Sequence, residues 1–493
     1  MARPSPAVEH LLRRAGFGAT PEEGAKFSRM TLPVAIAALV NYDPAKTDID
    51  AAIGTPGYVG ITIRTAFSPN TNITDARQRW LFRMVHSPAP LQEKMTLFWH
   101  HHFATAYSKV NGLSNQADAT RMMAGKKSQD PTGMRGQIEL FRDYALGSFR
   151  DLLIEVARDP AMLYWLDGYL NVRARPQENF GRELMELFTF GVDHYVETDV
   201  YAAARVFTGW NLRVTGTRGT PNAHYAFLYN ANQHDTNAKD FSFPIYANGS
   251  RRIEARAAAS GMQDGIDLIN ALAIHPETAR RLAKRLWTWF VSETEPPDEG
   301  FVDHISQTYL KNDTNMKPVV RAVLLSSHFL DQNRHYQRYA WPVEFVVRAL
   351  KEVGHVGFSV DSALTPLVNM GQQLFEPPDV NGWETGPGWF STGGMLSRMN
   401  FASALALNQR FELRDDARSS MGLAKLFRNA SPESLLSFVL SRLSLPEPAP
   451  EVRAALLDYV HAGGTWTGSE AQLLNKTGGL FHLLTGSGDY QLV

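Results

Sequence analysis

Residues 176–191 read PQENFGRELMELFTFG, and the pattern in this stretch decides the fold. Pro176 suits the first turn of a helix, where the missing amide hydrogen of proline costs no bond. Apolar side chains then recur at the three- and four-residue spacing of one helical face, at Phe180, Leu184, Leu187 and Phe188. The spacing predicts a helix over 179–190 that is apolar almost all round.

Three charged residues, Arg182, Glu183 and Glu186, fill one narrow stripe on this helix. We expect them to be largely buried and connected, because a buried ion must be paired or bound to a metal. In a structural interpretation Arg182 pairs with Glu186, and Glu183 pairs with an arginine at 173, 175 or 205. In a functional interpretation the two glutamates are acid/base groups or metal ligands, with burial raising one pKa.

The same helical period covers most of the chain and predicts an all-α protein. Helices are expected at 8–16, 75–86, 91–105, 136–158, 179–190, 198–209, 264–290, 301–311, 316–327, 342–353, 398–411 and 433–443. The period breaks at 211–250, where a few short strands are expected. It breaks again at 374–396, a Pro/Gly/Trp-rich loop.

Two lobes in one compact body are predicted. Residues 1–250 form an N-terminal helical lobe with His102 and Glu183/Glu186, and residues 251–493 form a C-terminal helical lobe that contributes the 374–396 loop.

Composition excludes several classes of function. Lys+Arg number 49 and Asp+Glu 50, so the net charge gives no basis for electrostatic binding of nucleic acid. With no cysteine, any metal must be held by His, Asp or Glu. The absence of thiols also suits an exported protein. No run of 18 apolar residues occurs, so no membrane span is expected, and Met1 to Pro6 has no secretion signal.

Histidines near the glutamate helix are further candidates. In Phe98-Trp-His-His-His-Phe103, helical geometry places His102 on the seam of Phe98 and points its neighbour His100 away. His102 is therefore a candidate ligand or acid/base, or else a core histidine bonded to a backbone carbonyl. His194 follows Glu186 by one short loop and is a second candidate.

These motifs together resemble the domain of unknown function 1800 family. The resemblance rests on 10–18, 99–103, 175–191, 194–195, 199–210, 234–239, 275–276, 377–383 and Arg398. It implies a largely helical bacterial protein, commonly exported and often encoded beside a sulfatase-like partner. A periplasmic or secreted location is therefore expected, with the cytoplasm left open. The chain differs in Gly181, where the family often has a larger residue.

The leading functional hypothesis is an exported, glycosidase-like hydrolase acting on a glycan or glycoconjugate. Carboxylates paired across a sugar, beside flat rings that stack on it, indicate this chemistry. Candidate catalytic residues are Glu183, Glu186, Glu178, Asp167, His102 and His194. Candidate substrate-binding residues are Trp165, Tyr195, Arg182, Trp210, Trp383, Trp389 and Asp379. We expect the histidines and the glutamate stripe to share one pocket walled by Trp165, Trp210 and Trp383.

Two alternatives stay open. One is a metal-dependent enzyme, in which a divalent ion is held by His102, Glu183, Glu186 and His194, with His234 as a further ligand. No cofactor is assigned by the leading hypothesis. The other is a non-enzymatic envelope protein for binding or assembly, in which the charged stripe is only structural.

Overall fold

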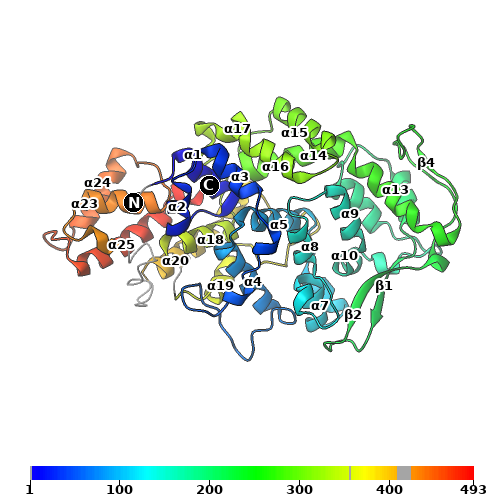
Figure 1. Ribbon diagram of the computed structural model, residues 1–493, viewed down its shortest axis with the longest axis horizontal. Coiled ribbons are helices and arrows are strands. Elements are labelled where there is room, and N and C mark those ends of the chain that lie inside the picture. The colour runs from blue at the N-terminus through cyan, green and yellow to red at the C-terminus, as the bar shows by residue number, and fades with distance from the viewer. Residues whose placement is uncertain (1–2, 355–356, 408–423) are drawn as a thin grey trace.

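The computed structural model describes residues 3–354, 357–407 and 424–493, and it is predominantly helical, as the sequence predicts (Figure 1). Helix α5 (Pro90–His102) lies in the middle of the molecule. Helices α23 to α25 lie at one end and strands β1 and β2 at the other.

The first half of the chain contains twelve α-helices. Their bounds are α1 Pro6–Gly16, α2 Pro21–Phe27, α3 Leu32–Val40, α4 Ile73–His86, α5 Pro90–His102, α6 Tyr107–Leu113, α7 Gln116–Ala124, α8 Gln137–Asp143, α9 Phe149–Arg158, α10 Pro160–Trp165, α11 Asn179–Glu183 and α12 Glu197–Val206. A π-helix, η5 (Leu184–Phe188), continues α11.

The second half continues the pattern in the described residues. Its helices are α13 Met262–Ala273, α14 Pro276–Leu286, α15 Glu299–Lys311, α16 Met316–Leu325, α17 Ser327–Leu330, α18 Pro342–Val353, α19 Asp361–Asn369, α20 Thr392–Ala406, α23 Pro432–Arg442, α24 Pro450–His461 and α25 Glu470–Thr485. A second π-helix, η8 (Trp287–Val291), continues α14. Short 3₁₀ turns connect several of these elements.

The four strands of the described residues lie in the predicted excursion and at its edges. β1 (Trp210–Thr215) pairs antiparallel with β2 (His224–Tyr229), and Trp210 is opposite Tyr229. β3 (Lys239–Asp240) pairs with β4 (Arg252–Ile253). The segment is therefore a hairpin followed by a two-residue ladder.

Two long predicted helices are each broken. The expected helix 264–290 is interrupted at His275, because the proline that follows disfavours helical backbone there. The expected helix 136–158 is interrupted over residues 144–148, where Ser148 bridges to Asn315 instead. Of the expected helix 398–411, residues 408–411 lie outside the described residues.

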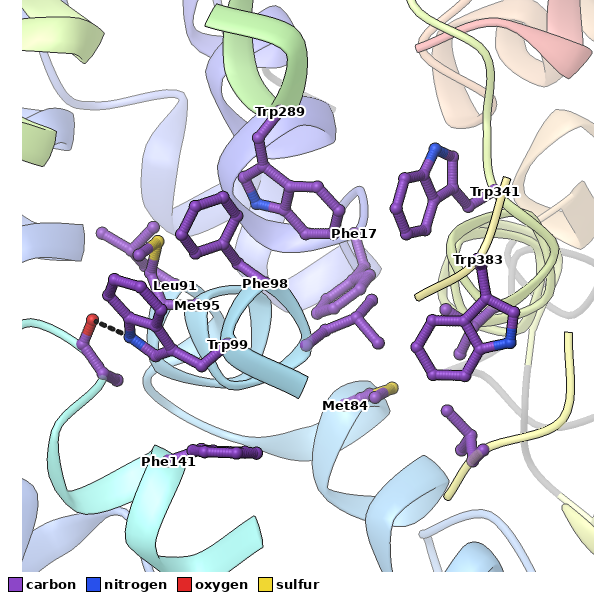
Figure 2. Close-up of a cluster of buried hydrophobic side chains, with 14 of the residues drawn as sticks. Phe17, Met84, Leu91, Met95, Phe98, Trp99, Phe141, Trp289, Trp341 and Trp383 are labelled. Atoms are coloured by element: carbon purple, nitrogen blue, oxygen red, sulfur yellow. Dashed lines mark hydrogen bonds between the residues drawn. The ribbon is translucent and has the colours of Figure 1, made fainter. Parts of the chain in front are cut away.

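The core is built around α5, whose residues are all buried. Helices α1, α3, α4 and α8 contact it. Its Trp99 donates to the carbonyl of Ala145, and Phe98 lies beside the Trp289 ring (Figure 2). Within the described ranges, none of the helices combines the length and apolar character needed to cross a bilayer.

Candidate functional site

A cavity of about 340 Å³ opens beside the C-terminal half of α5. Four parts of the chain line it: α5, the two π-helices with α14, the residue before α18, and the loop 380–385. The lining residues are Phe98, His101, His102, Leu187, Arg281, Arg285, Thr288, Trp289, Trp341, Val380, Asn381, Trp383, Glu384 and Thr385. Both π-helices contribute to this one cavity. π-Helical turns occur frequently at functional sites, which makes the cavity the candidate site.

Two arginines, one helical turn apart on α14, bring positive charge to the cavity. Arg281 donates from Nη2 to the carbonyl of Leu187 at 3.3 Å. In the described part of the chain, no hydrogen bond or ion pair to the Arg285 guanidinium is found. Burial and the neighbouring Arg281 charge lower the pKa of Arg285 to about 10. A largely buried cation without an anionic partner is costly unless a ligand supplies the anion.

His101 adds a neutral hydrogen-bond donor. Its Nδ1 accepts from the amide N–H of Trp383 at 3.2 Å, so the ring proton sits on Nε2. Burial, followed by the Arg285 charge, holds the pKa of His101 well below its usual value. The imidazole is therefore neutral, and its Nε2–H is available to a ligand.

The loop that reaches His101 depends on a glycine. Gly382 has a φ of +89°, and a Cβ there would lie 2.3 Å from Nδ1 of His101 and 2.6 Å from its carbonyl oxygen. Asp379 closes the turn, since its carboxylate accepts from the amide of Asn381 at 2.7 Å. The predicted substrate role of Asp379 therefore has a structural alternative, the formation of this turn.

His102 holds the first π-helix. Its Nε2 donates to the carbonyl of Phe188 at 3.1 Å, which is the core-histidine interpretation left open by the sequence. Its Nδ1 has no hydrogen-bond partner among the described residues. Burial, with the charges of Arg285 and Arg281, keeps the pKa of His102 well below its usual value. His102 is therefore a neutral wall residue of the cavity.

The second π-helix is fixed from α1 and carries Trp289. Arg14 donates to the carbonyls of Phe290 and Val291 at 3.0 Å each. Two cations lie near the Trp289 ring, with Lys94 Nζ 5.0 Å and Arg338 Cζ 4.8 Å from its centroid. Both cations pair with Glu344. Cation–π contacts and buried pairing hold this indole rigidly.

Indole rings wall the cavity, and Figure 2 shows Trp289, Trp341 and Trp383 together with Phe98. Trp289 and Trp341 meet edge to face at 4.9 Å. Trp341 also donates from its indole N–H to Glu293 at 2.9 Å. Such flat walls suit a ligand with a ring or another apolar face.

The charged stripe is only partly buried, less than the sequence predicts. The Arg182 side chain is 33% exposed and pairs with Glu178 and Glu197, the latter being 73% exposed. Among the ion pairs of the described residues, neither the predicted pair of Arg182 with Glu186 nor one of Glu183 with an arginine is found. The polar stripe faces the surface while the apolar faces of α11 and η5 contact the core, so solvent and surface partners stabilise its charges.

Glu183 and Glu186 nevertheless lie next to each other. Burial, followed by the Glu186 charge, raises the pKa of Glu183 above its usual value. In the described residues no hydrogen bond to Glu183 is found. Glu186 accepts a short hydrogen bond from Tyr195, and burial followed by Glu186 raises the pKa of that phenol to about 12.

The other predicted catalytic residues lie apart from the cavity lining. Asp167 accepts from Lys109 at 3.2 Å and from Asn179 at 3.1 Å. Glu178 pairs with Arg182 at the start of α11. His194 is largely exposed, and its Nε2 lies 3.7 Å from a carboxylate oxygen of Glu277.

Only Trp383 of the three predicted pocket tryptophans lines the cavity. Trp210 is buried against Phe207 and Phe227, in the core between α12, β2 and α13. Trp165 lies under Lys109, and Trp389 is behind the cavity, 5.6 Å from Trp341. The expectation of one pocket walled by Trp165, Trp210 and Trp383 was therefore wrong, since these rings belong to different packing layers.

The alternative metal site also does not assemble. Among the described residues, no group of three or more His, Asp or Glu side chains is placed to hold a metal ion. His102 and His194 are bonded to different partners, Phe188 and Glu277. His234 lies in a buried cluster with Asp264 and Lys239. The three histidines proposed as ligands thus lie in three different places.

Sequence reasoning missed most of the cavity: His101, Arg281, Arg285, Trp289, Trp341 and Glu384. One signal was present, because His101 is adjacent to His102, and Glu384 follows Trp383 directly in the loop that was singled out. No comparable pattern in the sequence marks Arg281 and Arg285, because their positions are those of charged residues on a solvent-exposed helix face.

The family description "Protein of unknown function (DUF1800)" matches residues 10–492 of the chain. The chain belongs to this family. The match includes every residue that lines the cavity. Neither the curated proteins nor the solved structures gave a match to the chain. Function is therefore argued from the site's own chemistry.

Proposed function

We propose that this family member recognises a compact anionic ligand, an acidic sugar unit of a glycan or glycoconjugate, in the arginine–tryptophan cavity. The observation that carries the proposal is Arg285, a guanidinium in a tryptophan-walled cavity that forms no ion pair with any of the described carboxylates. Arginine binds carboxylate and phosphate groups through paired N–H donors.

Several features of the cavity support an acidic sugar. Arg281 and the Nε2–H of His101 add donors near Arg285, so one anionic group can be bound by several N–H groups. Trp341 and Trp383 supply flat apolar surface for the C–H face of a sugar ring. The volume of about 340 Å³ is at the lower end of small-molecule sites and suits a single sugar unit.

Binding is tested by titrating the protein with glucuronic acid, glucose 6-phosphate and glucose while tryptophan fluorescence is recorded. The two acids should change the emission and saturate, and glucose should bind far more weakly. Arg285→Met should abolish the response. Arg280→Met is the matched control, because Arg280 lies on the same helix but pairs with Glu299 and Asp303 at the surface. An Arg285→Met protein that binds like the wild type would refute the proposal.

Hydrolysis of that ligand is a second candidate function. The specific observation is Glu183, whose pKa is raised by burial and by Glu186 and whose carboxyl has no hydrogen bond among described residues. A carboxyl of this kind can protonate a glycosidic oxygen while water attacks the sugar carbon. Glu186 lies one residue from Leu187, which lines the cavity.

The hydrolase is tested with 4-nitrophenyl glucuronide as substrate. We expect Glu183→Gln to remove release of nitrophenol but to leave the fluorescence response to glucuronic acid unchanged. Equal turnover in the Glu183→Gln protein would exclude Glu183 as the acid.

We also infer a periplasmic or secreted location and a sulfatase-like partner protein. The proposal rests on what the sequence resemblance implies and on the lack of cysteine. Cell fractionation and co-purification of the native protein test both points.

A further inference from the structure

The lining of the cavity also includes one exposed carboxylate. Among its described lining residues the one acid is Glu384, on the loop that carries Trp383. Its carboxylate lies against the backbone of Gly388, where a Cβ would approach Oε2 to 2.5 Å. No hydrogen bond or ion pair to Glu384 is found in the described part of the chain.

Opposite charges therefore line one cavity without meeting. Two guanidiniums come from α14, and one carboxylate comes from the loop 380–385. A Glu384 carboxylate that neutralised Arg285 would form an ion pair with it. Because no such pair forms, the space between the two side chains is available to a ligand that carries both a negative and a positive charge. His101 and His102 also line the cavity, but both are neutral and leave its balance of charge unchanged.

The tryptophan walls favour the same kind of ligand. Trp383 immediately precedes Glu384, and Trp341 is in the same cavity. Indole faces attract cations as well as sugar C–H groups. An ammonium group beside Glu384 would therefore also lie near an indole.

We propose that the cavity selects a zwitterionic sugar, an amino sugar that bears a phosphate ester. This assignment rests on the proposed recognition of an acidic sugar and names its class. The phosphate binds Arg281 and Arg285, the ring lies against the indoles, and the ammonium binds Glu384. Two cations and one anion on the protein thus meet two negative charges and one positive charge on the ligand.

The test compares four probes by isothermal titration calorimetry: glucosamine 6-phosphate, N-acetylglucosamine 6-phosphate, glucose 6-phosphate and glucosamine. Glucosamine 6-phosphate should bind about tenfold more tightly than glucose 6-phosphate, a preference of the size that one charged contact gives. Blocking the amine by acetylation should remove the preference. Glucosamine, which lacks the phosphate, should bind most weakly.

Glu384→Gln should bring glucosamine 6-phosphate to the affinity of glucose 6-phosphate and leave the latter unchanged. Glu277→Gln, which removes a carboxylate of α14 outside the cavity lining, is the control and should keep the preference. Equal binding of the two phosphates by the wild-type protein would overturn the zwitterion assignment but leave acidic-sugar recognition standing. Failure of all the acidic sugars to bind would overturn both.

Discussion

Two regions of the molecule bury positive charge in opposite ways. Around Asp264 on α13, Lys239 lies 2.5 Å and Arg256 3.2 Å from the carboxylate, and His234 lies at 3.3 Å. Although burial alone would raise it, the hydrogen bonds from His234 and Lys239 hold the pKa of Asp264 below its usual value. In the cavity, by contrast, Arg285 has no such partner among the described residues.

The difference separates structural from functional charge. The ion pairs of Asp264 hold the segment that follows β2 against α13. Within this cluster the positive charges are paired with a carboxylate of the protein. The Arg285 site is incomplete without a ligand, so it reduces stability in the free protein and contributes to binding. Removal of the central charged group should therefore lower stability at Asp264 but not at Arg285.

The largest effect is expected for Asp264→Ala. It leaves Lys239 and Arg256 without their shared anion, and breaking a buried ion pair in this way costs about 3 to 5 kcal/mol. Urea denaturation should show this loss. Asp303→Ala, which removes a largely exposed partner of Arg280, should cost less than about 1 kcal/mol. Equal losses in the two variants would show that the Asp264 cluster is not structural.

A smaller loss is expected for Gly382→Ala. The left-handed backbone costs an alanine about 1 to 2 kcal/mol, and the added Cβ also collides with His101. The loss should exceed 2 kcal/mol, roughly, and the fluorescence response to acidic sugars should disappear. Gly386→Ala is matched in backbone, with a φ of +74°, but has open space around its Cβ. If both variants lose the same stability, the close approach to His101 has no effect.

Arg285→Met should leave stability unchanged or raise it by about 1 kcal/mol, because an unpaired buried cation is replaced by an apolar chain. Thermal melts without ligand measure this. Arg280→Met should lower stability slightly, since it breaks two surface pairs. A destabilised Arg285→Met protein would mean that Arg285 is structural, like Lys239.

The smallest effect concerns pH. Because burial and Glu186 raise the pKa of Glu183 on folding, the folded protein binds that proton more tightly. The linked stability is present below the unfolded glutamate pKa of about 4.3 and is lost as pH rises through the folded pKa. Glu183→Gln should remove this loss, which is expected to be less than about 1 kcal/mol because the side chain is partly exposed. Urea melts at pH 4 and pH 7 test it, with Glu178→Gln as control.

Local pattern was enough to predict the helical class, the hairpin region and the family. Apolar spacing at Phe180, Leu184 and Phe188 predicts a helix whatever surrounds it, and these side chains are buried. The strand excursion was visible because helical spacing stops after Trp210. Gly181 has a packing reason, since a Cβ there would lie 2.9 Å from that of Ala203 on α12.

The site depended on tertiary structure. Arg280 and Arg285 look alike in sequence, yet one meets Glu299 and Asp303 at the surface and the other enters a cavity. That outcome depends on which elements pack against each side of α14. One of them, the loop 380–385, lies about a hundred residues further along the chain. Helical period fixes which side chains share a face, whereas only the packing of distant elements decides whether a charge on that face meets water, a partner or a ligand.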